Sequence, residues 1–174
     1  AIFTNKDKIA NKIYSIRNHG AGDNKYDNIR IGINGRLDSI QAAILLEKLS
    51  IFEDEIASRN KIAENYSCGI TDIIKKPKIP KGYKSSWAQY SILLPKYSDR
   101  ESLIKFLKER NIPSMIYYEK PLHLQKVFKY LGYQYGDFPV SEMISKSILS
   151  LPMHPYLKSN QQMKIIDAIN EYFK

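Results

Sequence analysis

The sequence predicts a mixed α+β fold from about residue 70 onward, in which a small β-sheet is covered by α-helices. Three observations support this class. Apolar residues repeat every three or four positions from Asp38 to about Tyr66, which predicts a long amphipathic helix. Residues 86–94 instead alternate between apolar and more polar side chains, as a strand with one buried face does. A helix and a second short strand follow, so helices and strands are interleaved along the chain.

The first 37 residues contain one predicted helix and a long loop. Residues 1–4 read as the end of a β-strand, and Thr4 is placed to cap a helix that continues to about Ile16. Gly20 predicts the end of this helix, because glycine readily adopts the left-handed conformation found at helix C-termini. Residues 21–37 show no periodicity and are rich in Gly, Asp and Asn. We expect a loop there, and a loop of this length is usually functional.

The strongest helical pattern starts at Asp38. Asp38 followed by Gln41 has the spacing of an N-cap residue and its partner three positions later. An uninterrupted helix from there to Tyr66 would extend about 40 Å, which is longer than a small domain needs. The pattern therefore predicts either a bend near Ser50 or a helix that bridges two domains.

Past residue 70 the predicted elements alternate between strands and short helices. A connector rich in Lys and Pro, residues 75–84, precedes the strand at 86–94. Two further helices begin at pairs with capping spacing. These pairs are Ser98 with Glu101 and Ser159 with Gln162. The remaining predicted elements are a strand at 114–118, helices at 121–131 and 139–149, and an extended segment at 149–153.

Size and charge narrow the class of protein. The 174 residues are 43% hydrophobic, enough for a globular core, and no apolar run approaches the roughly 18 residues that cross a bilayer. We therefore expect a soluble, cytoplasmic protein without a membrane partner. The net charge of +9 suits nucleic acid, anionic lipid or a phosphorylated small molecule. The excess lysine is scattered, and its densest cluster lies in the connector at 75–84, so we do not expect a nucleic-acid partner.

Metal binding and nucleophilic catalysis find little support. Cys68 is the single cysteine, so it cannot form an internal disulfide, and we expect it to be structural or incidental. His19, His123 and His154 are widely separated and lack the spacing of zinc ligands. No serine stands in a nucleophile-elbow sequence. We therefore predict no metal site.

An anion site is predicted just before the Asp38 helix. Asn34 and Arg36 stand in a loop that contains Gly32 and Gly35, which would allow a ligand to approach the backbone. An amide and a guanidinium beside a helix N-terminus suit an anion, and phosphate is the commonest biological one. We interpret Asp38 as a capping residue although its carboxylate also has the chemistry of a catalytic group.

His123 is the best candidate among the histidines. It lies in a Pro-containing turn with nearby aromatic and amide groups, where an imidazole can bind a sugar or a phosphate. The alternative is an exposed histidine at the start of a helix. His19 and His154 have weaker contexts, since one follows a helix end and the other is flanked by Met153 and Pro155.

Four motifs in order resemble one known family. The segment at 32–43 reads Gly-x-Asn-x-Arg-Leu-Asp-x-x-Gln-Ala-Ala. The other three are Ile-Arg-Asn-His-Gly at 16–20, Pro-Leu-His-Leu-Gln at 121–125 and Leu-Ser-Leu-Pro-Met-His-Pro at 149–155. Together they resemble the C-terminal half of the DegT/DnrJ/EryC1/StrS nucleotide-sugar aminotransferases, over nearly the whole chain.

The resemblance implies a fold, a cofactor and a reaction. It implies an α/β protein with the C-terminal part of the aspartate aminotransferase architecture (PLP fold type I) and a small α+β C-terminal domain. The expected activity is a pyridoxal 5'-phosphate (PLP) dependent transfer of an amino group from glutamate to a nucleotide-linked keto sugar, for surface polysaccharide or glycan biosynthesis. The expected assembly is a homodimer. Asn34 matches a residue that binds the cofactor phosphate in the neighbouring subunit, Arg36 one near the nucleotide diphosphate, and His123 one near the sugar.

The resemblance also implies an incomplete enzyme. The family's Schiff-base lysine belongs upstream of the segment that matches Ala1, so we expect this chain to lack the catalytic lysine and to be inactive alone. Residues 1–49 would be the truncated end of the large PLP-binding domain, and residues 50–174 the small C-terminal domain. Two alternatives are a stand-alone binding or regulatory module derived from this fold and a basic nucleic-acid binder.

Overall fold

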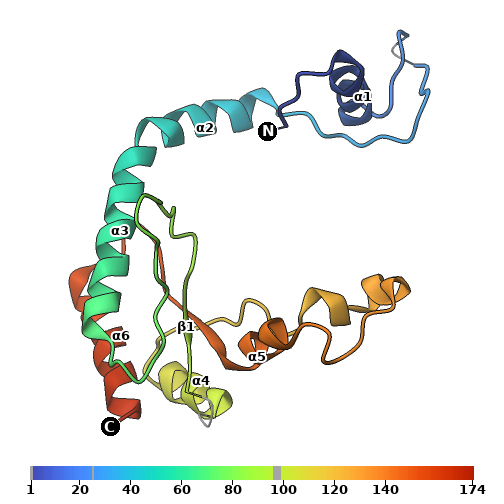
Figure 1. Cartoon of the computed structure of the whole chain (residues 1–174). Helices are drawn as coiled ribbons and strands as arrows, with labels where there is room; N and C mark the ends of the chain where they lie inside the picture. Colours follow the sequence, from blue (N-terminus) through green and yellow to red (C-terminus); the bar gives the residue numbers. More distant parts are fainter. Residues whose placement is uncertain (1, 25, 96–98) are drawn as a thin grey trace. The chain divides into compact units, whose positions relative to one another are not determined.

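A computed structural model of the chain describes residues 2–24, 26–95 and 99–174 (Figure 1). The chain divides into two compact units, Ala1–Ile51 and Phe52–Lys174. The first unit contains α1 (Asp7–Arg17) and α2 (Ser39–Ser50). Among the described residues, no helix is both long enough and apolar enough to span a bilayer.

The start of the first unit differs from the prediction. Residues 2–4 form no strand, because no described segment pairs with them. The Oγ1 of Thr4 accepts a hydrogen bond from the backbone N–H of Lys6 at 3.2 Å, in a local turn. The N-cap of α1 is Lys6, whose side chain makes no capping bond. The predicted Thr4 cap is therefore wrong, and α1 begins at Asp7.

Backbone pairing orders the long loop of the first unit. The loop segment near Asn34 returns to the end of α1, where Asn18 and Asn34 form an antiparallel bridge. Gly20 has a φ of +78°, and a Cβ on it would lie 1.8 Å from the carbonyl oxygen of Arg30. A Cβ on Gly32 would lie 2.0 Å from the backbone nitrogen of Gly20. The two glycines thus let two backbone segments approach each other, which corrects the expectation that Gly32 serves a ligand's approach.

The Asp38 cap is confirmed. Its Oδ1 accepts a hydrogen bond from the backbone N–H of Gln41 at 2.8 Å, and α2 begins at the next residue. The helix is interrupted at Ile51, and α3 (Phe52–Gly69) begins immediately after it. The predicted interruption near Ser50 is therefore confirmed, and it coincides with the boundary between the two units.

The second unit is built on a two-stranded antiparallel sheet. Strand β1 (Tyr90–Leu93) pairs with β2 (Ile148–Leu151), with Tyr90 opposite Leu151. Single bridges extend the sheet on both sides, from Lys75 to Leu93 and from Met115 to Ser150. The strand predicted at 114–118 is thus reduced to one bridge. Pro113 and Pro95 flank the paired segments, and proline cannot donate a hydrogen bond to a ladder.

Three helices cover this sheet and form the core with it. They are α3, α4 (Arg100–Glu109) and α6 (Ser159–Tyr172), and α6 packs against both α3 and α4 (Figure 1). All the buried apolar residues of the described chain belong to this core: Ile62, Ala63, Tyr66, Ile70, Ile74, Trp87, Tyr90, Ile92, Leu94, Leu103, Leu107, Ile112, Leu149, Leu151, Ile165, Ala168 and Ile169. The predicted α+β class of residues 70–174 is therefore confirmed.

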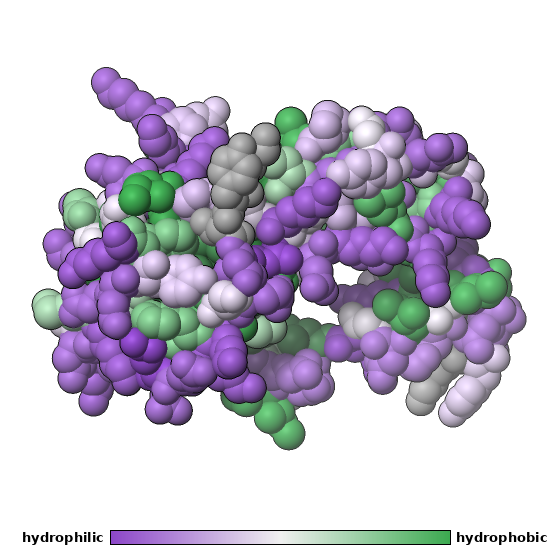
Figure 2. Space-filling model, turned by 90° about the horizontal axis from the view of Figure 1, so that it is seen from below, coloured by the Kyte–Doolittle hydropathy of each residue, from purple (hydrophilic) through white to green (hydrophobic). Residues whose placement is uncertain are grey.

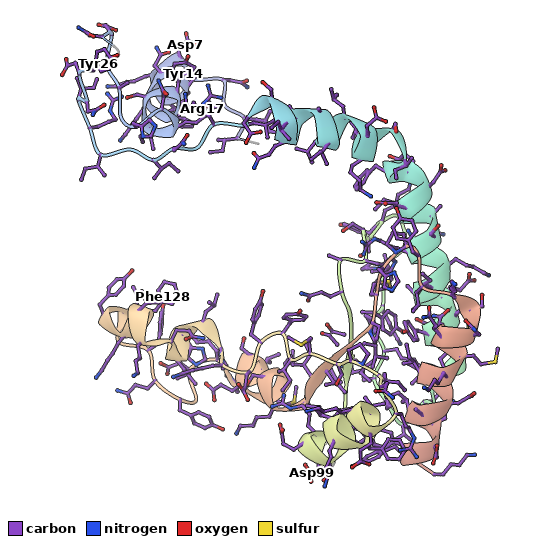
Figure 3. The ribbon with its side chains drawn as sticks, turned by 180° about the vertical axis from the view of Figure 1, so that it is seen from behind. Asp7, Tyr14, Arg17, Tyr26, Asp99 and Phe128 are labelled. Carbon is purple, nitrogen blue, oxygen red and sulfur yellow. The ribbon has the colours of Figure 1, made fainter. Side chains whose placement is uncertain are left out.

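The capping residues of α4 and α6 differ from the predicted ones. Asp99 caps α4 by accepting from the backbone N–H groups of Glu101 and Ser102, whereas Ser98 lies outside the described residues (Figure 3). At the start of α6, Gln161 accepts from the backbone N–H of Lys158 at 3.2 Å. The predicted pair of Ser159 with Gln162 is thus one residue out of register. Gln162 is buried instead, because it lies on the face of α6 that packs against the core.

The helix predicted at 121–131 forms as two 3₁₀ helices, η1 (Leu122–Leu124) and η2 (Lys126–Leu131). The next helix, α5 (Pro139–Ser147), begins with a proline, which lacks only an N–H that would be unpaired there. Together, η1, η2 and α5 extend away from α3 and α6 within the second unit (Figures 1 and 3). We call residues 118–145 the arm of the second unit.

Candidate functional site

Asn34 and Arg36 form an exposed hydrogen-bonded pair. The Nε of Arg36 donates to the Oδ1 of Asn34 at 3.2 Å, and both residues are exposed. This bond uses the acceptor atom of the amide and one nitrogen of the guanidinium. The NH₂ group of Asn34 and the terminal nitrogens of Arg36 therefore remain as donors, which are the groups that bind phosphate oxygens.

Backbone hydrogen bonds to the end of α1 hold the loop that carries this pair. Gly35 donates its backbone N–H to the carbonyl of Arg17 at 2.8 Å, and His19 donates to the carbonyl of Ile33 at 3.0 Å. The guanidinium of Arg17 lies 4.8 Å from the centre of the Tyr14 ring on the same helix (Figure 3). Arg17, which stands in the motif at 16–20, thus places a second guanidinium on the segment that pairs with the loop.

The helix N-terminus contributes less than the sequence predicted. The carboxylate of Asp38 already occupies the end of α2 and brings a negative charge to it. Asp38 takes up the N–H of Gln41 alone, so an anion bound here would draw on the side chains of Asn34 and Arg36 together with the remaining N–H groups at the start of α2.

His123 is paired with a buried carboxylate in the arm. The Nε2 of His123 lies 2.9 Å from the Oε1 of Glu142, and their side chains are only 7% and 5% exposed. The same oxygen accepts the backbone N–H of Gly136 at 2.8 Å and that of Phe138 at 3.4 Å. The imidazole also packs against the Phe138 ring, with the ring centres 4.8 Å apart. His123 is therefore not the exposed residue of the alternative interpretation.

The environment of Glu142 favours its charged form. Burial raises the pKa of the carboxyl group, but the hydrogen bonds from Gly136, His123 and Phe138 lower it by more. The pKa of Glu142 consequently lies below its ordinary value. An ionised carboxylate only accepts hydrogen bonds, so Nε2 of His123 is the group that can donate in this contact.

His123 also lines a cavity of about 630 Å³ in the arm. This volume is in the range of small-molecule sites. The cavity has mostly apolar and aromatic walls with few polar groups. Its lining residues are Tyr118, Lys120, Pro121, Leu122, His123, Gln125, Phe128, Leu131, Tyr133, Phe138, Ser141, Ile144 and Ser145.

The predicted site residues thus fall into two groups. Asn34 and Arg36 meet in the first unit, and His123 meets Glu142 in the second. His19, His154 and Cys68 are exposed. The described residues contain no cluster of three or more His, Cys, Asp or Glu that could hold a metal ion.

Glu142 was missed by the sequence reasoning. It stands in the first turn of α5, where an acidic residue is ordinary because it interacts favourably with the helix dipole. Glu142 is buried because η1 and residues 136–138 approach α5. No periodicity in the sequence predicts that approach.

Known proteins resemble this chain over most of its length. A family model described as the DegT/DnrJ/EryC1/StrS aminotransferase family matches residues 1–170. A curated relative from Pseudomonas aeruginosa, named UDP-2-acetamido-2-deoxy-3-oxo-D-glucuronate aminotransferase, is 41% identical over 97% of this chain and 45% of its own length. A relative from Geobacillus stearothermophilus, named pleiotropic regulatory protein, is 40% identical over 99% of this chain and 46% of its own length.

A solved structure supports the same fold. A DegT/DnrJ/EryC1/StrS aminotransferase from Brucella abortus is 49% identical, with a TM-score of 0.84 over 98% of this chain and 45% of that one. The fold is the C-terminal part of the PLP fold type I architecture, as the motifs implied. This chain spans about half the length of the curated relatives it matches.

Proposed function

Because this chain belongs to the DegT/DnrJ/EryC1/StrS aminotransferase family, whose members depend on PLP, we propose that it is part of an enzyme that transfers an amino group from glutamate to a nucleotide-linked keto sugar. The printed name of the Pseudomonas aeruginosa relative, an aminotransferase of a UDP-linked 3-oxo sugar, supports this substrate class. The proposed role of the product is in surface polysaccharide or glycan biosynthesis.

The observation that carries the proposal is the exposed pair of Asn34 and Arg36. Its free amide and guanidinium donors fit a phosphate group, and both a PLP phosphate and a nucleotide diphosphate require such donors. We assign Asn34 to the cofactor phosphate of a neighbouring subunit in a homodimer, and Arg36 to the diphosphate of the substrate. PLP supplies the electron sink for amino transfer, while these residues bind and orient the reactants.

His123 is assigned to the sugar part of the substrate. Its place on the wall of the arm's cavity supports this role, because the aromatic walls suit the apolar face of a sugar ring. In this proposal residues 1–49 belong to the large PLP-binding domain and residues 50–174 form the small domain. The proposal places the Schiff-base lysine outside these 174 residues, so we expect no transaminase activity when the chain is given PLP and glutamate.

The test uses the full-length parent protein. Asn34→Ala should weaken PLP binding about 10- to 100-fold, the effect of losing one hydrogen bond to a charged group, as measured by titration of cofactor absorbance. Asn11→Ala is the matched control, because Asn11 is an exposed asparagine on α1 of the same unit and should leave the affinity unchanged. Equal affinities for the two variants would remove the assigned role of Asn34.

One observation favours a second candidate. The Geobacillus stearothermophilus relative is named as a regulatory protein, so a non-catalytic binding or regulatory module remains the alternative. The presence of the Schiff-base lysine in the coding sequence upstream of Ala1, with transaminase activity of the parent on a UDP- or dTDP-linked keto sugar, would support the enzyme. A parent protein without that lysine and without that activity would support the regulatory module.

A further inference from the structure

One carboxylate oxygen ties together three segments of the arm. The Oε1 of Glu142, on α5, binds Nε2 of His123 on η1 and the backbone N–H groups of Gly136 and Phe138. These four residues form what we call the His123 clamp. The Phe138 ring packs against the His123 ring on one side and against Tyr133, 5.1 Å away between ring centres, on the other. The clamp therefore fixes both the imidazole and one aromatic wall of the cavity.

The second ring nitrogen of His123 has a different environment. Nδ1 makes no hydrogen bond within the described part of the chain. Among the described residues, the fully buried side-chain polar atom without a hydrogen-bond partner is Nε of Arg100, so Nδ1 of His123 is not fully buried. His123 also lines the cavity, and Nδ1 is the ring nitrogen that the His123 clamp does not use.

The hydrogen bond to Glu142 decides which ring nitrogen of the neutral imidazole carries the proton. With Nε2–H donating to the carboxylate, the neutral ring has a lone pair on Nδ1 and accepts a hydrogen bond there. Without the carboxylate, the ring would distribute between both tautomers. Most of the described residues that line this cavity are apolar or aromatic, and Lys120 is the one Lys or Arg among them, a lining that suits the apolar face of a sugar ring with a few polar contacts.

We propose that Glu142 is a positioning residue that holds Nε2 of His123 and leaves Nδ1 to bind a hydroxyl group, so that the arm's cavity takes the sugar or ribose part of a nucleotide sugar. This proposal adds detail to the assignment of His123 to the substrate. Its ligand, a nucleotide sugar, rests on the proposed function. The tautomer of His123 does not depend on that function.

The first test measures the tautomer directly in the 174-residue chain. Long-range proton–nitrogen NMR spectra of the imidazole rings, at a pH where all three are neutral, should show His123 as the single Nε2–H tautomer. His19 and His154 are internal references, because both are exposed and should show averaged tautomers. An averaged or Nδ1–H ring at His123 would overturn the proposal without affecting the amino-transfer function.

The second test separates positioning from general stability. Glu142→Gln should mix the tautomers of His123, because an amide can donate as well as accept. Glu119→Gln makes the same chemical change at an exposed carboxylate on the segment leading into η1, and should leave the His123 spectrum unchanged. An unaltered spectrum in Glu142→Gln would contradict the positioning role. If that variant does not fold, the spectrum of the unmodified chain still decides the question.

The third test concerns the ligand. In the full-length parent, UDP-N-acetylglucosamine should bind about tenfold more weakly to Glu142→Gln than to Glu119→Gln, as calorimetry would measure. Equal affinities of the two variants would overturn the hydroxyl assignment while leaving Asn34 and its PLP test untouched.

Discussion

The two units of the chain differ in where their apolar side chains lie. In the first unit, α2 has no buried residue, and Leu46 on it is 68% exposed. In the second unit, Leu107 on α4 is fully buried in the core. On the face drawn in Figure 2, apolar residues, in green, are exposed among hydrophilic ones, in purple. The leucine side chains of α2 are thus exposed, whereas those of α4 are buried.

This difference teaches how each candidate site is built. The Asn34 and Arg36 pair stands on a frame of local backbone hydrogen bonds, and its side chains stay exposed. The His123 clamp needs side chains and backbone from three segments that pack together. The first site is therefore sensitive to its own side chains, whereas the second is also sensitive to the packing around it.

The largest expected effect tests the difference in burial between α4 and α2. Leu107→Ala should lower the free energy of unfolding by about 3 kcal/mol, because it removes a fully buried side chain and leaves a cavity. Leu46→Ala, the same change on α2, should stay within about 0.5 kcal/mol. Urea denaturation of the chain, followed by circular dichroism, measures both. An equal loss for the two variants would show that α2 is packed in solution.

The next effect tests a buried polar contact against an exposed one. The Nε2 of Gln162 donates to the carbonyl of Ile62 at 2.7 Å, and its Oε1 accepts from Asn65 at 3.1 Å, so it joins α6 to α3. Gln162→Ala should lower the free energy of unfolding by about 1–3 kcal/mol, because it leaves buried groups unpaired. Gln41→Ala on exposed α2 is the control and should have little effect. Similar denaturation midpoints for the two variants would contradict this interpretation.

The smallest effect concerns acid stability of the second unit. Hydrogen bonds from Ser102, and the backbone N–H of Glu101, hold the pKa of Asp99 below its ordinary value. A carboxyl group with a lowered pKa in the folded state binds fewer protons than in the unfolded state. Its stabilising contribution is therefore present above about pH 4 and is lost as the pH falls through the folded pKa.

Asp99→Asn tests this sign. Asparagine caps a helix about as well as aspartate but does not titrate there, so the variant should show a shallower loss of stability between pH 7 and about pH 3.5. The measurement is the urea midpoint at each pH. An unchanged acid dependence would mean that Asp99 contributes nothing to it, and would leave Glu142, whose pKa is lowered in the same direction, as a remaining source.

Several elements were predictable because their signals are local. The Asp38 cap, the interruption near Ser50 and the strand near Tyr90 depend on residues within a few positions of one another. The four ordered motifs likewise identified the family, since order and spacing are properties of the chain alone. The roles of Asn34, Arg36 and His123 stay predictions until the binding experiments are done.

Other features had no local signal. Gln162 has the spacing of a capping residue, but the packing of α6 on α3 turns it into the core. Gly32 reads as a ligand-facing glycine, but the backbone of Gly20 occupies the space beside it. In both cases a residue distant in sequence determines the outcome.

The sequence by itself therefore determined the family, the class of fold and the local starts and breaks of its main helices, because periodicity and capping act over a few residues. Only the tertiary structure decided that Glu142 is buried and that it holds one nitrogen of His123. The physical reason is that burial and hydrogen-bond partners depend on which segments meet in space. Contacts between distant segments have no fixed separation along the chain, so no sequence pattern predicts them.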